Sequence, residues 1–66
     1  MEPAKGTIWK HVRTGHTYEV LCCASAEHDL SRVVIYQRAE PDAPTVIWSR
    51  WVVEFMDGRF EQVRNG

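Results

Sequence analysis

A chain of 66 residues with a formal net charge of −1 is too short for two hydrophobic cores and has no surplus of lysine and arginine. Its length predicts one domain of marginal stability, because so short a chain buries only about 60% of the surface it exposes when unfolded. Its charge gives no support to general nucleic-acid binding, which needs a basic surface to displace counterions. A hydrophobic content of 44% excludes an intrinsically disordered chain.

Turn signals that recur roughly every eight to twelve residues divide the chain into five short predicted strands. These strands span residues 7–12, 17–24, 32–38, 45–50 and 59–63. Turns are predicted at 13–16, around Gly15, and at Asp57-Gly58, and loops at 25–31 and 39–44. Residues 51–56 fit either a continued strand or one helical turn.

Alternation within the strands predicts which side chains form the core. In the third strand, residues 33–36 are all apolar, which indicates burial on both faces. Phe60 and Val63 are the expected anchors of the last strand. In the second strand, the predicted core face is Tyr18, Val20, Cys22 and Ala24, opposite Leu21 and Cys23.

The expected architecture is a mainly β, single domain over residues 1–66, with an ordered core at about 6–63 and loose ends. A small five-stranded SH3-like (Tudor-like) barrel fits best, because closure removes unpaired edge strands. Small domains often gain stability by association, so a homo-oligomer is kept open.

No apolar run approaches the roughly 20 residues that span a bilayer. The first six residues also lack the apolar core of a signal peptide, so we expect a cytoplasmic protein without a membrane partner. In that compartment the adjacent Cys22 and Cys23 are expected to be reduced, one inside and one outside or at an interface.

The order and spacing of several short segments resemble a family of small bacterial and phage domains, catalogued as domain of unknown function 1653. The segments are Trp9-Lys10-His11, Gly15, Tyr18-Glu19-Val20-Leu21, Val34-Ile35-Tyr36, Trp48-Ser49-Arg50, Phe55 and Arg59-Phe60. This chain departs from the family at Ala26, where a His is frequent, at Trp51, where the family has Pro, and in a shorter segment before Arg59. The resemblance implies an SH3-like fold in a divergent member, and it implies no function.

The common chemical motifs are absent from the sequence. There is no Gly-rich phosphate loop and no Cys-x-x-Cys pair. His11, His16 and His28 lie on separate predicted segments, so we expect neither a metal nor a cofactor. Glu54 and Asp57 flank a turn and are interpreted as solvated charges in preference to a catalytic pair. We therefore expect a protein that is not an enzyme.

The aromatic and arginine content is the remaining functional signal, because Trp, Tyr and Arg are enriched at binding hot spots. Trp48 is expected in the core, whereas Trp51 is an exposed anchor or a packed side chain with equal weight. If its segment is helical, Arg50 can pair with Glu54, four residues on. The candidate binding residues are Trp51, Arg50, Tyr36, Trp9 and Arg59.

The leading functional hypothesis is a phage- or prophage-type binding module that docks onto a host protein, with inhibition of a bacterial defence system as one such role. The first alternative is a homo-oligomer that sequesters a small anionic ligand such as a nucleotide signal, held by stacking and arginine contacts. The second is single-stranded nucleic-acid binding on aromatic platforms, which the missing basic excess disfavours.

Overall fold

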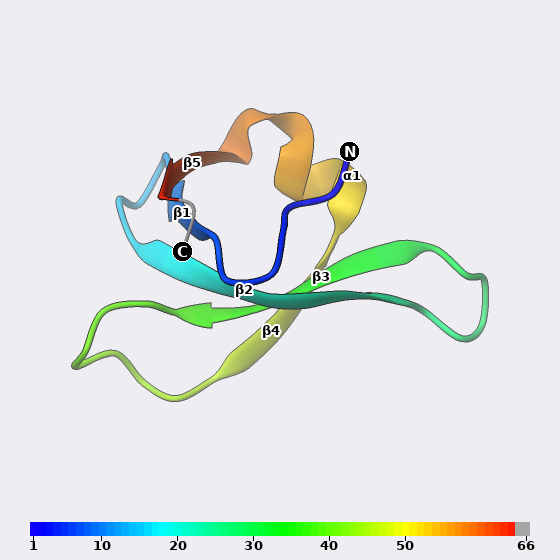
Figure 1. Ribbon diagram of the computed structural model, residues 1–66, viewed down its shortest axis with the longest axis horizontal. Helices are drawn as coiled ribbons and strands as arrows, with labels where there is room; N and C mark the ends of the chain where they lie inside the picture. The colour runs from blue at the N-terminus through cyan, green and yellow to red at the C-terminus, as the bar shows by residue number, and fades with distance from the viewer. Residues whose placement is uncertain (65–66) are drawn as a thin grey trace.

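The structure is a computed structural model that describes residues 1–64 of the chain. Its framework is one antiparallel sheet of five strands in the order β4-β3-β2-β1-β5 (Figure 1). The strands are β1 (Ile8–His11), β2 (Thr17–Ser25), β3 (Arg32–Arg38), β4 (Ile47–Trp51) and β5 (Phe60–Arg64). All five predicted strands are confirmed, with every boundary within two residues of its predicted place.

The sheet is not closed, because β4 and β5 are its two edges and do not pair with each other. The mainly β fold is therefore confirmed, whereas the predicted closure into a barrel is not seen. Two long hairpins, β2–β3 and β3–β4, extend to opposite sides of the molecule (Figure 1). β1, β5 and the helical segment lie together on one side of these hairpins, as Figure 1 shows.

Residues between β4 and β5 form a helical turn and not a continued strand. The turn consists of α1 (Val52–Glu54) and η1 (Phe55–Arg59), and it reverses at Gly58, whose φ is +107°. Glycine adopts this region without the Cβ clash that other residues suffer, so the predicted Asp57-Gly58 turn is confirmed. None of the helices in residues 1–64 is long and apolar enough to cross a membrane.

A β-bulge in β2 changes which of its side chains face the core. The pairing with β3 shifts between Val20, opposite Tyr36, and Cys22, opposite Ile35. One extra residue reverses the alternation beyond that point. The prediction that Cys22 and Ala24 share the core face of Val20 is therefore wrong. Cys22 is exposed, whereas Cys23 packs against the core.

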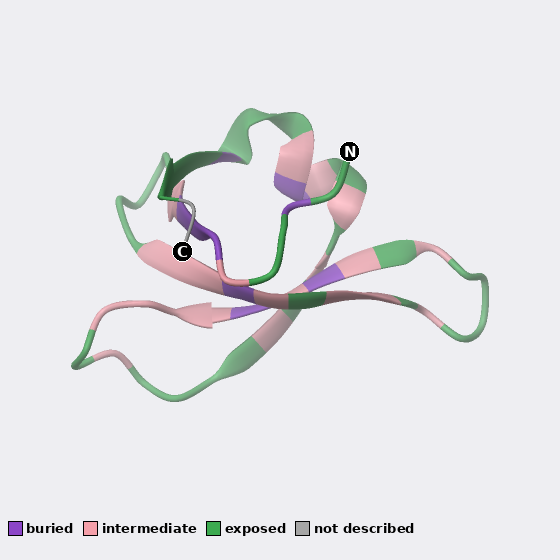
Figure 2. Ribbon diagram, viewed as in Figure 1, coloured by how far each residue is buried: buried purple, intermediate pink, exposed green. Residues whose placement is uncertain are grey.

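The core is built mainly from aromatic rings. Phe55 and Phe60 stack with ring centroids 4.2 Å apart and planes 10° from parallel. The ring of Trp9 meets Phe55 edge-on at 5.3 Å, and Tyr36 meets Phe55 at 5.4 Å. Such pairs add about 0.5–1.5 kcal/mol beyond the area that they bury. The buried cluster is Trp9, Val20, Val34, Tyr36, Phe55 and Phe60 (Figure 2).

Two of the predicted core assignments differ from the structure. In β3, Val34 and Tyr36 are buried, but Val33 and Ile35 on the opposite face are only partly buried. Burial of β3 on both faces is thus not seen. Val63, the second predicted anchor of the last strand, is 48% exposed, because β5 is an edge strand and only its first residue reaches the core.

The first residues of the chain, which precede the ordered core predicted from sequence, contact the sheet. Nε and Nη2 of Arg32 donate to the carboxylate of Glu2 at 2.6 and 2.9 Å. Pro3 is buried, and the Cys23 thiol donates to its carbonyl at 3.7 Å. Burial raises the pKa of this thiol, which disfavours the reactive thiolate.

Glu40 ties the loop after β3 to the start of β2. Its Oε2 accepts a hydrogen bond from the backbone N–H of Thr17 at 2.7 Å, and its Oε1 accepts one from Nε of Arg38 at 2.7 Å. These bonds, the backbone one first, lower the pKa of Glu40 to about 2. Because its ordinary pKa is 4.5, the carboxylate stabilises the fold above that pH and loses its effect as the pH falls towards 2.

We predict that Glu40→Gln lowers the free energy of unfolding at pH 7 by about 1 kcal/mol, a modest loss because the side chain is partly exposed and screened. The deficit should shrink as the pH falls from 4.5 to 2. Urea denaturation of the wild-type protein and of Glu40→Gln at several pH values measures this difference in the free energy of unfolding. A deficit that does not change with pH would show that the charge of Glu40 is not what stabilises the loop.

Candidate functional site

An exposed apolar patch surrounds the end of β4. We call Leu30, Trp51 and Val53, together with Met1, the Trp51 patch. Trp51 is 54% exposed, Leu30 72% and Val53 75%. These side chains line one hollow of about 660 Å³, which the ion-paired Glu2 and Arg32 also border. Apolar side chains gathered around one hollow are typical of a binding surface, whereas single exposed ones are ordinary.

Leu30, in the Trp51 patch, has an unfavourable backbone conformation. It lies in the β2–β3 loop with a φ of +60°, the only positive φ outside glycine among residues 1–64. The loop is closed by a hydrogen bond from Leu30 N–H to the carbonyl of Ala26 at 2.7 Å, and Ala26 N–H donates to Ser31 at 2.8 Å. A branched apolar residue is strained in this region, which Gly or Asn occupies readily. Outliers of this kind cluster at functional sites.

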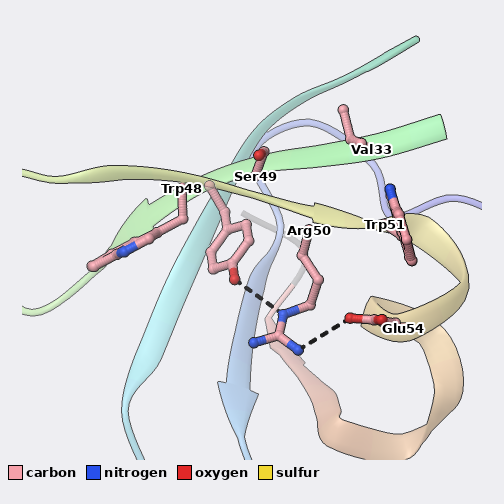
Figure 3. Close-up of a pocket in the computed structure, with 7 residues that line it drawn as sticks. Val33, Trp48, Ser49, Arg50, Trp51 and Glu54 are labelled. Carbon is pink, nitrogen blue, oxygen red and sulfur yellow. Dashed lines mark hydrogen bonds and ion pairs between the residues drawn. The ribbon is translucent and has the colours of Figure 1, made fainter. Parts of the chain in front are cut away.

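Arg50 extends from β4 towards Glu54 (Figure 3), and as the neighbour of Trp51 on a strand it points to the other face of the sheet. Its Nε donates to the hydroxyl of Tyr36 at 3.3 Å, and its Nη1 lies 3.6 Å from the carboxylate of Glu54. The guanidinium carbon is 5.5 Å from the ring centroid of Phe60. The bond to Tyr36 is the main cause that raises the pKa of Arg50, so the group stays charged. Arg50 is therefore fixed by three contacts.

The acidic side chains near the helical turn pair with arginines and not with each other. Oε1 of Glu54 accepts from Nη1 of Arg59 at 3.3 Å, and Asp57 lies 3.2 Å from Nε of Arg59. The expected Arg50–Glu54 pair is present at 3.6 Å, although Arg50 lies in β4 and only Glu54 lies in the helical turn. Both carboxylates thus balance arginines, an arrangement that serves the local structure.

The five predicted binding residues fall in three places. Trp51 is on the surface, and Arg50 and Arg59 lie together beside the helical turn. Tyr36 and Trp9 are buried, with exposed fractions of 5% and 7%. Trp9 donates from Nε1 to the hydroxyl of Thr7 at 2.9 Å, so both ends of its ring are engaged inside the protein.

The third tryptophan takes an intermediate position. Trp48 is partly buried and packs against the core, with its ring 5.7 Å from Tyr18, which agrees with the expectation that it is a core residue. It also lines a hollow of about 450 Å³ with Trp51 and Arg50 (Figure 3).

Sequence reasoning did not select Leu30 or Val53. Leu30 was predicted to lie within a polar loop, and Val53 within the segment of ambiguous structure. The signal for Leu30 was available, since it is the one large apolar residue in a run that is otherwise polar or Ala. A large apolar residue in a hairpin loop lies far from the core and is therefore a candidate for exposure on the surface. Val53 offered no comparable signal.

The two edges of the sheet differ in how well they are protected. Edge strands in natural proteins are commonly shielded by charges. β5 carries Glu61, paired with Lys10 at 3.8 Å, and ends on Arg64. The exposed side chains of β4 are Ile47, Ser49 and Trp51, none of them charged. The β4 edge, next to the Trp51 patch, is therefore the edge open to another protein segment.

No family model, curated protein or solved structure matches the chain. Among residues 1–64, no three His, Cys, Asp or Glu side chains are arranged to hold a metal ion. The site is therefore defined by an exposed tryptophan and a strained leucine that border one hollow, next to the β4 edge of the sheet.

We predict that Leu30→Asn raises the free energy of unfolding by about 0.5–1 kcal/mol, because asparagine tolerates a positive φ that strains leucine. Thermal or urea denaturation measures the change. Leu21→Asn, in a strand, is the contrasting control and should destabilise. A loss of stability in Leu30→Asn would mean that the leucine contributes packing that outweighs its backbone strain.

Proposed function

We propose that the protein is a non-catalytic binding module that docks onto another protein through the Trp51 patch. The observation that supports this most is the exposed ring of Trp51 beside Leu30, an apolar residue kept on the surface at a cost in backbone strain. Tryptophan is among the residues that contribute most binding energy when they enter a partner's pocket.

The chemistry of this surface defines the kind of partner. An apolar pocket would receive the Trp51 ring, with Leu30 and Val53 at its margin. An extended segment of the partner can lie along the edge of β4, whose exposed side chains carry no charge, and add a strand to the sheet. The Glu2–Arg32 pair at the border is already neutralised, so the contact needs no strong charge on the partner.

The biological setting that we propose follows from the resemblance to small bacterial and phage domains. In it, a phage- or prophage-borne protein with an SH3-like fold acts in the cytoplasm on a host protein, and inhibition of a defence system is one such role. Self-association through the same surface is the competing use of the patch and is an outcome of the test below.

Single-stranded nucleic acid is a poorer candidate partner. Such binding uses a basic groove that follows the backbone of the strand. Here four arginines are each paired with a carboxylate, at 2.6 Å in Arg32–Glu2 and 2.7 Å in Arg38–Glu40, and in the Arg50 and Arg59 pairs described above. This local neutralisation supports a protein partner. Binding of a small anion, the other alternative, requires only a few cationic side chains close together and not a continuous basic groove.

We predict that Trp51→Ala reduces the recovery of a specific partner at least tenfold when the tagged protein is incubated with a lysate of its host. Loss of a buried hot-spot tryptophan typically costs 2 kcal/mol or more, which is about 30-fold in affinity. Quantitative mass spectrometry of the bound fraction measures the ratio. Val63→Ala is the matched control, since Val63 is 48% exposed on the other edge of the sheet.

Leu30→Asn separates binding from folding in the same experiment, because we expect it to stabilise the chain and still weaken docking. Equal recovery by all variants would contradict the proposal. A second result would also contradict it: a dimer in analytical ultracentrifugation that is lost in Trp51→Ala, together with no binding to any other protein. The patch would then serve self-association.

A further inference from the structure

A second hollow lies near the helical turn, separate from the Trp51 patch. It has a volume of about 530 Å³ and is lined by His11, Val12, Arg13, Arg50 and Arg59. Three arginines from three different segments therefore line one space. They come from the β1–β2 turn, from β4 and from the end of η1.

The backbone fixes these segments relative to one another. Val12 N–H donates to the carbonyl of Arg59 at 2.9 Å, which joins the end of β1 to the end of η1. The ring of His11 packs edge-on against Phe60 at 4.9 Å, and Arg50 lies over the same Phe60 ring. Two of the lining residues, His11 and Arg50, thus pack on the core residue Phe60, which holds this side of the hollow in place.

The local charges do not cancel. Glu54 and Asp57 are the carboxylates paired with Arg50 and Arg59, so two negative charges stand against three positive ones and leave one positive. Within residues 1–64, the Arg13 side chain takes part in no hydrogen bond or ion pair. Arg50 and Arg59 use Nε and Nη1 in their contacts, and a guanidinium has five N–H donors, so each keeps donors for a ligand.

We infer that this hollow binds a phosphate-bearing anion, with Arg13 as its principal ligand and Arg59 and Arg50 at its side. A planar guanidinium matches two oxygens of a phosphate, which makes arginine the residue best suited to such recognition. Arg13 is the only one of the three that an anion meets without a competing carboxylate. The inference does not depend on the proposed docking function, because the Trp51 patch contributes none of these residues.

Isothermal titration with inorganic pyrophosphate and, separately, with ADP tests the site at low salt. We expect binding that Arg13→Ala weakens about tenfold or more, the usual effect of losing a charge-assisted hydrogen bond. Lys5→Ala, which removes an equal charge at an exposed position elsewhere, should stay within about twofold. Arg59→Ala should also weaken binding.

The two probes distinguish the source of the phosphate. Equal affinities would assign the site to the phosphate group alone, whereas tighter binding of ADP would assign it to a nucleotide. Absence of heat with both probes at millimolar concentration would overturn the inference. Equal losses in Arg13→Ala and Lys5→Ala would overturn it too, because net charge and not this hollow would then govern binding.

Discussion

The stacked rings of Phe55 and Phe60 are the interaction on which the rest of the structure depends. The two residues are five positions apart, and their rings become parallel at 4.2 Å only because the chain reverses at Gly58. The helical turn after β4 reverses at Gly58 and leads into β5. Without it, β5 would not return to pair with β1, and the aromatic cluster would lose its centre.

The surface around these two rings has two parts of different chemistry. On one side the helical turn carries Val53 beside Trp51, which leaves apolar side chains in solvent. On the other side, Arg50 lies over the Phe60 ring, and Arg59 follows Gly58 directly. An apolar patch and a cationic hollow therefore adjoin one small core.

The sequence was sufficient to predict the strands, because each strand is marked locally by a run of β-branched and aromatic residues between turn residues. It also led us to expect the Arg50–Glu54 pair, which is present although Arg50 lies in β4 and the helical turn begins only at Val52. The β-bulge after Val20 could not be predicted from the sequence, because the Leu and Cys residues that follow Val20 fit either face of a strand. Burial of Trp9 and exposure of Trp51 were likewise undetermined, because both depend on which sheet face the helical turn covers. The placement of Leu30 at a positive φ is a property of the folded loop.

The central claim is that the Trp51 patch is a surface for another protein, and hydroxyl-radical footprinting tests it most directly. The purified chain and the chain in concentrated host extract are oxidised in parallel, and modification of each side chain is quantified by mass spectrometry. The account predicts that Trp51 and Leu30 are readily oxidised in the purified chain and are protected in extract, whereas Val63 is oxidised equally in both. Protection of all three side chains to the same degree, or of none, would contradict it.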